Sequence, residues 1–199
     1  MFRTALTGAA ALVVFGVAAA APASAQTAVS LSRTATRVLF DGTDTIKDND
    51  GSRVTLRTVL EYNPSAGEYV QTVTTPDGAV RSRDVSRAMM VRPTRAEDQA
   101  ARTLIALDAT VASEMSRSVY PSFVDGGFAL VREAGHPCGP GSRCLQYDVL
   151  QSVPGEAFAR RMRYVVVDLQ SLTVVSNDFD PATDGNLANP AFRAQSRSN

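Results

Sequence analysis

The sequence predicts an α+β fold, with one main helix at about residues 94–118 packed on antiparallel sheet. Two observations lead to this prediction. A single long segment after the first two dozen residues has helical periodicity, and the chain before and after it alternates between apolar and polar residues in short runs. Gly, Pro, Asn and Asp separate these runs, as is typical of hairpin turns between antiparallel strands. We therefore expect an N-terminal meander, the helix, and a C-terminal run of four strands.

The helix has a clear start signal. Thr94 is followed three residues later by Glu97, the spacing of a capping box, in which the Thr hydroxyl accepts from the Glu amide and the carboxylate reaches back to the cap amide. Apolar side chains then fall on one side at about 100° per residue. They are Ala100, Ala101, Leu104, Ile105, Leu107, Val111, Ala112, Met115 and Val119.

Asp108 is the one polar residue near the middle of this apolar stripe. Our first interpretation is that the helix breaks at Leu107 and Asp108 caps a second short helix. The second is a buried carboxylate paired with an arginine, because an unpaired buried charge is expensive. The third is an acid of raised pKa that lines a cleft.

The N-terminal meander is expected to have three strands or four. Val54, Leu56, Thr58 and Leu60 alternate with polar residues, as in a half-buried strand. We expect a turn-rich segment over 41–51, whose aspartates do not fit a calcium-binding loop. In the EF-hand register, Ile46 and Arg57 would occupy the two key acidic positions. The expected strands are 37–40, 54–61, 69–74 and 79–85.

The C-terminal run follows the helix. Its second strand shows the clearest alternation, in which Leu145, Tyr147, Val149 and Gln151 face one way. Pro154-Gly155 marks the next turn. The four expected strands are 128–133, 144–153, 161–168 and 172–176.

The first residues have the pattern of a bacterial secretory signal. Arg3 precedes an apolar run, and small residues end it at Ala25, so cleavage is expected before Gln26. We expect a signal peptide at 1–25, a single domain at 26–180 and a flexible polar tail at 181–199. The mature protein would be periplasmic or secreted and would have no membrane span. Equal numbers of basic and acidic residues, 20 of each, give no reason to expect a nucleic-acid partner.

Cys138 and Cys144 are the two cysteines of the chain, and in an oxidising compartment they predict a disulfide that staples a Gly- and Pro-rich loop. The alternative is a metal site with His136, which would need a fourth ligand. Because His136 is the one histidine, triad mechanisms and zinc hydrolase chemistry are disfavoured. No phosphate-binding or dinucleotide-binding glycine pattern is present. We expect no catalytic residues, no metal and no cofactor.

A helix followed by four antiparallel strands resembles the small cystatin-like α+β modules, such as PepSY domains and the N-terminal domains of copper amine oxidases. The resemblance covers residues 93–179. It is carried by PTRAE at 93–97, GGF at 126–128, CLQ at 144–146 and VVVDL at 165–169. The amine oxidase site needs an Asn-Tyr motif and three histidines, which this sequence lacks. The resemblance therefore implies a non-catalytic binding, inhibitory or accessory module.

We expect a non-enzymatic module that engages a protein or peptide partner. A carrier of a small apolar ligand is the first alternative, and a hydrolase based on carboxylates is the second. A long exposed sheet edge would favour the module, because edges recruit extended peptides. A closed apolar cavity of about 300 Å³ or more would favour the carrier. Two carboxylates facing each other in a cleft, Asp108 among them, would favour the hydrolase.

Overall fold

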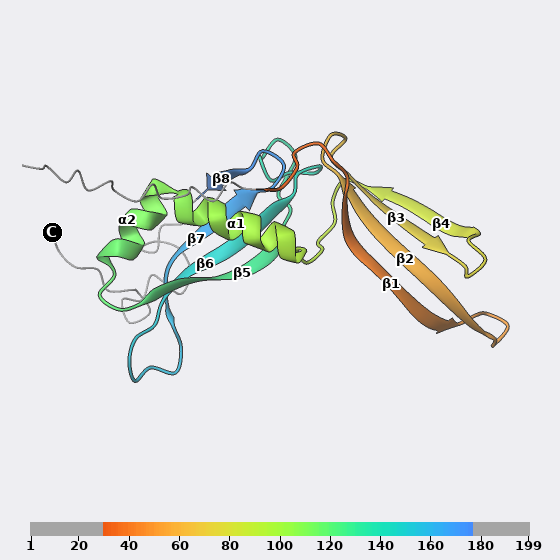
Figure 1. The fold of residues 1–199 in the computed structure, drawn as a ribbon, viewed down its shortest axis with the longest axis horizontal. Helices are drawn as coiled ribbons and strands as arrows, with labels where there is room; N and C mark the ends of the chain where they lie inside the picture. Colours follow the sequence, from red (N-terminus) through yellow and green to blue (C-terminus); the bar gives the residue numbers. More distant parts are fainter. Residues whose placement is uncertain (1–29, 177–199) are drawn as a thin grey trace, which may run out of the picture.

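The computed structural model describes residues 30–176, which form two helices and two four-stranded antiparallel sheets. The predicted α+β class is confirmed. The first sheet holds the first four strands, and the second sheet follows the helices in the chain and lies beside them (Figure 1). The two strand groups thus form two separate sheets rather than one.

The first sheet is a four-stranded meander in the order β1-β2-β3-β4. Its strands are β1 (Arg37–Lys47), β2 (Arg53–Asn63), β3 (Glu68–Thr74) and β4 (Val80–Ser86). The predicted turn over 41–51 was wrong in its first part, since β1 continues to Lys47. Backbone pairing with β2 runs through this part, and side-chain contacts accompany it: Arg57 donates to both oxygens of Asp41, and the hydroxyls of Thr45 and Thr55 lie 3.2 Å apart.

The helical region contains α1 (Arg95–Leu107) and α2 (Ala109–Arg117). The capping box at the start of α1 is confirmed, since Glu97 N–H donates to Thr94 Oγ1 and Thr94 N–H donates to Glu97 Oε2. Between the helices, Asp108 has extended backbone angles of φ −68° and ψ 120°. One residue of extended backbone therefore turns the predicted single helix into two.

The second sheet has the order β5-β6-β7-β8. Its strands are β5 (Ser122–Leu130), β6 (Cys144–Gln151), β7 (Arg160–Asp168) and β8 (Thr173–Ser176). The predicted start of β5 at Phe128 was wrong. Gly126 and Gly127, at φ +112° and +96°, lie at a register shift inside the strand rather than in a turn before it.

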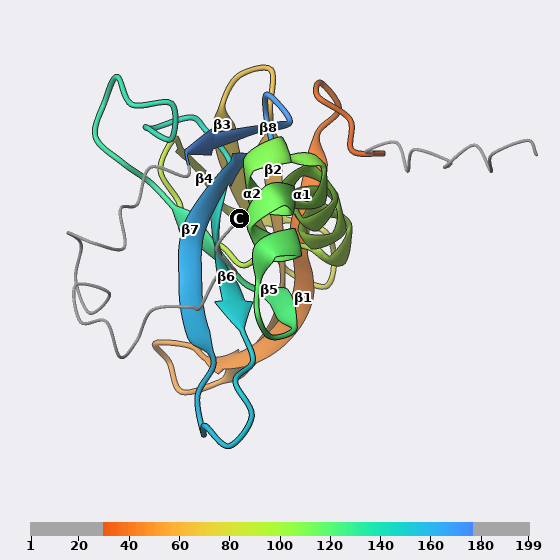
Figure 2. The same cartoon turned by 90° about the vertical axis from the view of Figure 1, so that its left-hand side faces the viewer.

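The helices cover one face of the second sheet (Figure 2), where the main core forms. The alternation predicted for β6 is confirmed, because Leu145, Tyr147 and Val149 are fully buried there. A smaller cluster on another part of this half contains Cys138, Cys144 and Val166. The main core also contains Ala100, Ala101, Ile105, Val111, Met162, Val165, Val167 and Leu169.

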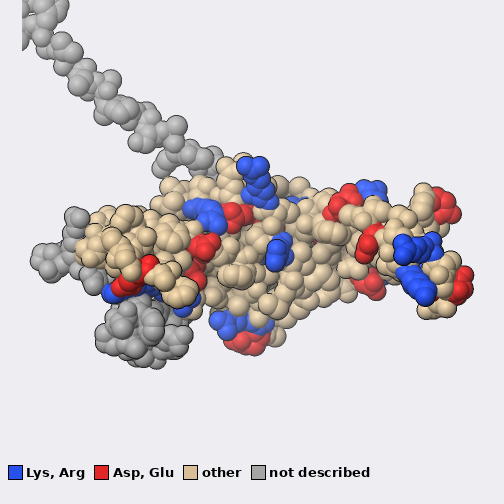
Figure 3. Space-filling model, turned by 90° about the horizontal axis from the view of Figure 1, so that it is seen from below, with Lys and Arg blue, Asp and Glu red and all other residues tan. Residues whose placement is uncertain are grey.

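The first sheet buries far less. Its core cluster contains Leu60, Tyr62 and Tyr69 at the end near the helices, with Leu39, Met89 and Val91 packed against it. Most of β1 and β4 is exposed. Seen from below (Figure 3), basic and acidic side chains are interspersed on this end and along the rest of that face, with no broad patch of one sign.

The predicted signal peptide with its cleavage site at Ala25 and Gln26, and the predicted tail at 181–199, lie outside the described residues. Within residues 30–176, no helix has the length and apolar character that a membrane crossing needs.

Candidate functional site

The two sheets meet at a buried polar junction, which we define as Arg37, Tyr62, Tyr69, Glu97 and Arg143. Arg37 begins β1, and the two tyrosines form a cross-strand pair between β2 and β3. Glu97 lies in the first turn of α1, and Arg143 directly precedes β6. Five separate elements therefore contribute to one cluster.

Glu97 is the centre of the junction and has 0% of its surface exposed. Its Oε2 accepts from Arg143 Nη2 at 2.9 Å and its Oε1 from Arg143 Nε at 3.2 Å, a two-pronged pair with a side chain that is 1% exposed. Burial by itself would lower the pKa of Arg143, but the hydrogen bonds and charge of Glu97 outweigh it and hold that pKa above its usual value.

Arg143 also orders the linker between β4 and α1. Its Nη1 and Nη2 donate to the carbonyl oxygens of Val91 and Arg92, at 2.9 and 3.2 Å. These two residues lead into the capping box at Thr94. One buried guanidinium therefore joins the linker, the first turn of α1 and the start of β6.

Arg37 brings a second buried positive charge to Glu97. Its Nη1 lies 3.3 Å from Glu97 Oε1, and its Nη2 donates to the Leu169 carbonyl at 3.4 Å. The guanidinium carbon lies 5.1 Å from the ring centre of Tyr62, a cation–π distance. Burial lowers the pKa of Arg37, and the charge of Glu97 partly offsets this.

The hydroxyl groups of the two tyrosines donate hydrogen bonds to the loop that precedes β6. Tyr62 Oη donates to the Gly141 carbonyl at 2.8 Å, and Tyr69 Oη donates to the Ser142 carbonyl at 3.0 Å. Their ring centres lie 4.8 Å apart. Burial raises the pKa of both phenols. The first sheet is thus fastened to the second half by hydrogen bonds as well as by charge.

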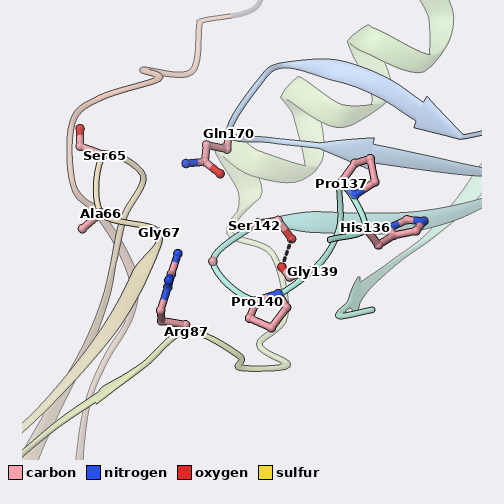
Figure 4. Close-up of a pocket in the computed structure, with 11 residues that line it drawn as sticks. Ser65, Ala66, Gly67, Arg87, His136, Pro137, Gly139, Pro140, Ser142 and Gln170 are labelled. Atoms are coloured by element: carbon pink, nitrogen blue, oxygen red, sulfur yellow. Dashed lines mark hydrogen bonds between the residues drawn. The ribbon is translucent and has the colours of Figure 1, made fainter. Parts of the chain in front are cut away.

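A polar pocket of about 280 Å³ lies next to the junction (Figure 4). Three loops form its walls: the β2–β3 turn, the disulfide loop before β6 and the β7–β8 turn. Arg87, which follows β4, completes it. The lining residues are Ser65, Ala66, Gly67, Arg87, His136, Pro137, Gly139, Pro140, Gly141, Ser142 and Gln170.

The outer edge of β1 is the longest sheet edge in the described part of the chain. After a register shift between Val38 and Phe40, its pairing with β2 is unbroken as far as Lys47. Thr45 N–H donates to Asp44 Oδ1 at 2.8 Å, so it points away from β2. Since the direction alternates along an antiparallel strand, the N–H groups of Thr43 and Lys47 point outward too.

The disulfide between Cys138 and Cys144 is confirmed, with the two Cα atoms 5.6 Å apart. It closes the loop that forms one wall of the pocket. His136 is half-buried in the same loop, and its Nδ1 accepts from the Cys138 N–H at 2.9 Å. Because both sulfur atoms are bonded to each other, the alternative metal site at these residues is excluded.

Asp108 lies away from the junction. Its Oδ1 accepts from the N–H groups of Thr110 and Val111, at 3.0 and 2.9 Å, and it is half-buried. This is the helix cap that we ranked first. The carboxylate is therefore used as a helix cap, and it is half-buried rather than fully buried.

The described residues include no group of three or more His, Cys, Asp or Glu side chains placed to hold a metal ion. The three arginines of β7 are paired with acids: Arg160 with Glu156, Arg161 with Asp148, and Arg163 with Glu114.

Sequence reasoning did not find the junction. The spacing from Thr94 predicts that Glu97 is a capping residue, but nothing local indicates that its carboxylate is also buried between Arg37 and Arg143, which are distant in the chain. The usable signal was Tyr62 and Tyr69 on either side of the turn at 63–67, since paired aromatic residues at the base of a hairpin indicate a packed end.

No protein-family model matches the chain, and no curated protein matches it in sequence. Among solved structures, part of the chain matches a copper-containing benzylamine oxidase from Hansenula polymorpha, with 13% sequence identity and a TM-score of 0.39. The match covers 62% of this chain and 20% of that one. At this level the likeness says nothing of activity, and no residue role is carried over from it.

Proposed function

We propose that this chain is an exported, non-enzymatic binding module that engages a protein partner by pairing β1 with an extended segment of that partner. The carrying observation is the outer edge of β1, which runs unbroken from Phe40 to Lys47 and directs the N–H groups of Thr43 and Lys47 outward, on either side of the Thr45 N–H that donates to Asp44 Oδ1. Such an edge offers hydrogen bonds to an added strand.

The side chains beside this edge supply apolar contacts. Phe40 is 52% exposed and Ile46 37% exposed, and their pairing with Leu60 and Val54 places them on one face of the sheet. The ring of Phe40 lies across Gly42, where a Cβ atom would stand 2.5 Å from the ring. An added strand would pack its own side chains against Phe40 and Ile46, which favours a partner segment with alternating apolar residues.

The helices and the second sheet serve as the support in this proposal. A helix followed by strands in the order β5-β6-β7-β8 is the arrangement expected of a cystatin-like module. The junction holds the first sheet on this support. The alternatives are less well supported, because the described pocket is polar rather than apolar and the Asp108 carboxylate is used as a helix cap.

Site-specific photo-crosslinking in the exporting bacterium tests the proposal. Benzoylphenylalanine replaces Thr43 on the edge or, as a matched control, Thr110 on the exposed side of α2. We expect a covalent adduct with one defined protein from position 43 and none from position 110. The same set of adducts from both positions, or none from position 43, would contradict the proposal.

A further inference from the structure

We propose that the polar pocket beside the junction is a binding site for a carboxylate group, with Arg87 as its positive partner. The carboxylate could belong to a small dicarboxylic acid or to the C-terminus of a peptide, and the two present the same chemistry. This site is separate from the β1 edge, and the inference does not depend on the proposed function.

The charge of the pocket favours an anion. Of the residues that line it, Arg87 is cationic and none is acidic. Figure 4 shows the Arg87 guanidinium standing beside Gly67 and directed into the space between the β2–β3 turn and the disulfide loop. Within residues 30–176, no carboxylate lies within ion-pair distance of it. An anion entering the pocket would therefore meet an uncompensated positive charge.

The walls of the pocket are held in place before any ligand arrives. Gly141 N–H donates to the Arg87 carbonyl at 2.6 Å, which ties the end of the first sheet to the disulfide loop. The bond between Cys138 and Cys144 closes that loop. A fixed pocket loses little conformational entropy when a ligand binds, so weak individual contacts can add up to measurable affinity.

Two glycines allow two turns to approach each other beside the Arg87 guanidinium. A Cβ on Gly141 would stand 2.8 Å from Arg87 Nη2, and one on Gly67 would stand 2.7 Å from the Gly141 carbonyl. Both glycines have positive φ, +98° and +63°, which side chains rarely adopt. A side chain at either position would displace the Arg87 guanidinium or push the two turns apart.

Two further polar side chains belong to residues that line the pocket, although the His136 ring lies across the disulfide loop from Arg87 (Figure 4). His136 Nδ1 accepts the Cys138 N–H, so the proton of the neutral ring is on Nε2, which is a donor. Gln170 donates to the Pro64 carbonyl through its side-chain nitrogen, which has a second N–H. A guanidinium group matches a carboxylate with two parallel N–H donors, which favours that group over a spherical anion.

The size of the pocket limits the ligand. About 280 Å³ is at the lower end of the range for small-molecule sites, so the pocket suits one carboxylate and a few further atoms. A peptide C-terminus would place its last residue here and lead out of the open side.

Calorimetric titration with two probes tests the inference. The first probe is succinate, and the second is trialanine, used with a free and with an amidated C-terminus. We expect saturable binding of succinate, of free trialanine, or of both, and no binding of the amidated peptide. Succinate alone would identify a small acid as the ligand source, and free trialanine alone would identify a chain terminus.

Variants assign the binding to Arg87. Arg87→Gln should weaken it by about tenfold or more, because the two-pronged contact is lost. Arg83→Gln removes the same charge from an exposed position on β4 outside the pocket and should change the affinity by less than about twofold. Circular dichroism of both variants checks that they fold. No saturable binding, equal weakening by both variants, or equal binding of the free and amidated peptides would overturn the proposal.

Discussion

At the scale of single residues, Glu97 determines the character of the junction. It closes the capping box of α1 and also lies between the guanidinium groups of Arg37 and Arg143. The cluster therefore has two positive charges and one negative charge in a buried place. Removing the single negative charge should be far more damaging than removing an exposed one.

We expect Glu97→Gln to lower the free energy of unfolding by about 3–5 kcal/mol, since it leaves buried guanidinium charge without a partner. The glutamine side chain keeps one acceptor oxygen for the cap amide, so the loss reports on the pairing with the arginines rather than on the cap. Denaturant unfolding at neutral pH measures it. The control is Asp41→Asn, which removes an exposed pair with Arg57 and should leave the unfolding midpoint nearly unchanged. Equal effects of the two variants would contradict this account.

Tyr62 tests the contact between the two halves. Tyr62→Phe removes the donor to the Gly141 carbonyl, and we expect a loss of about 1–3 kcal/mol in the free energy of unfolding. Denaturant unfolding at neutral pH measures this loss. An unchanged stability would mean that the hydrogen bond contributes nothing.

Three buried tyrosines predict that the stability of the protein depends on pH. Burial raises the pKa of Tyr62, Tyr69 and Tyr147 above the usual 10.0. The folded protein therefore keeps its phenolic protons to higher pH than the unfolded chain does. The resulting stability is fully present below pH 10 and is lost as the pH rises above it. Unfolding curves across this range should show the decline, and the decline should be shallower in Tyr62→Phe.

At the scale of elements, local patterns predicted what local contacts determine. The capping box, the break at Asp108 and the alternation of β6 all depend on residues within a few positions of one another. The errors have a common cause. The segment 41–47 is rich in Asp and Thr, yet backbone pairing with β2 carries the strand through it as far as Lys47. Gly126 and Gly127 indicated a turn, yet pairing with β6 carries β5 through them.

Asp108 gives an element-scale prediction. Asp108→Ala should lower the free energy of unfolding by about 1 kcal/mol, because α2 loses its cap. Asp108→Asn keeps an acceptor oxygen and should lower it by much less. Thermal or denaturant unfolding of the two variants measures this difference. If the Asn variant were as destabilised as the Ala variant, the negative charge rather than the cap would be important.

The disulfide loop provides a second prediction at the scale of elements. The bond joins residues six positions apart, and opening it should lower the free energy of unfolding by about 2 kcal/mol on the chain-entropy model. The double variant Cys138→Ala/Cys144→Ala provides the measurement by denaturant unfolding. Two free thiols in the untreated, exported protein, detected by alkylation and intact mass, would show that the bond does not form.

At the scale of the whole molecule, the joining of the two sheets was not predictable from the sequence. It depends on Arg37 and Arg143, which are far apart in the chain and look like any other arginines in it. Only the folded chain brings both to Glu97. The same holds for the pocket, whose walls come from turns around Gly67, Gly141 and Gln170. Its glycines were visible in the sequence, but the approach of one turn to another was not.

The central claim is that the outer edge of β1 binds a partner strand. The most direct test compares Thr43→Pro with Thr43→Ala in affinity for the protein that is crosslinked at position 43. Proline removes an N–H that points away from β2, so the first sheet should stay intact in both variants. The account predicts that Thr43→Pro weakens binding by about tenfold or more, while Thr43→Ala stays within about twofold of the original chain. Equal affinities of the two variants would contradict strand pairing at this edge.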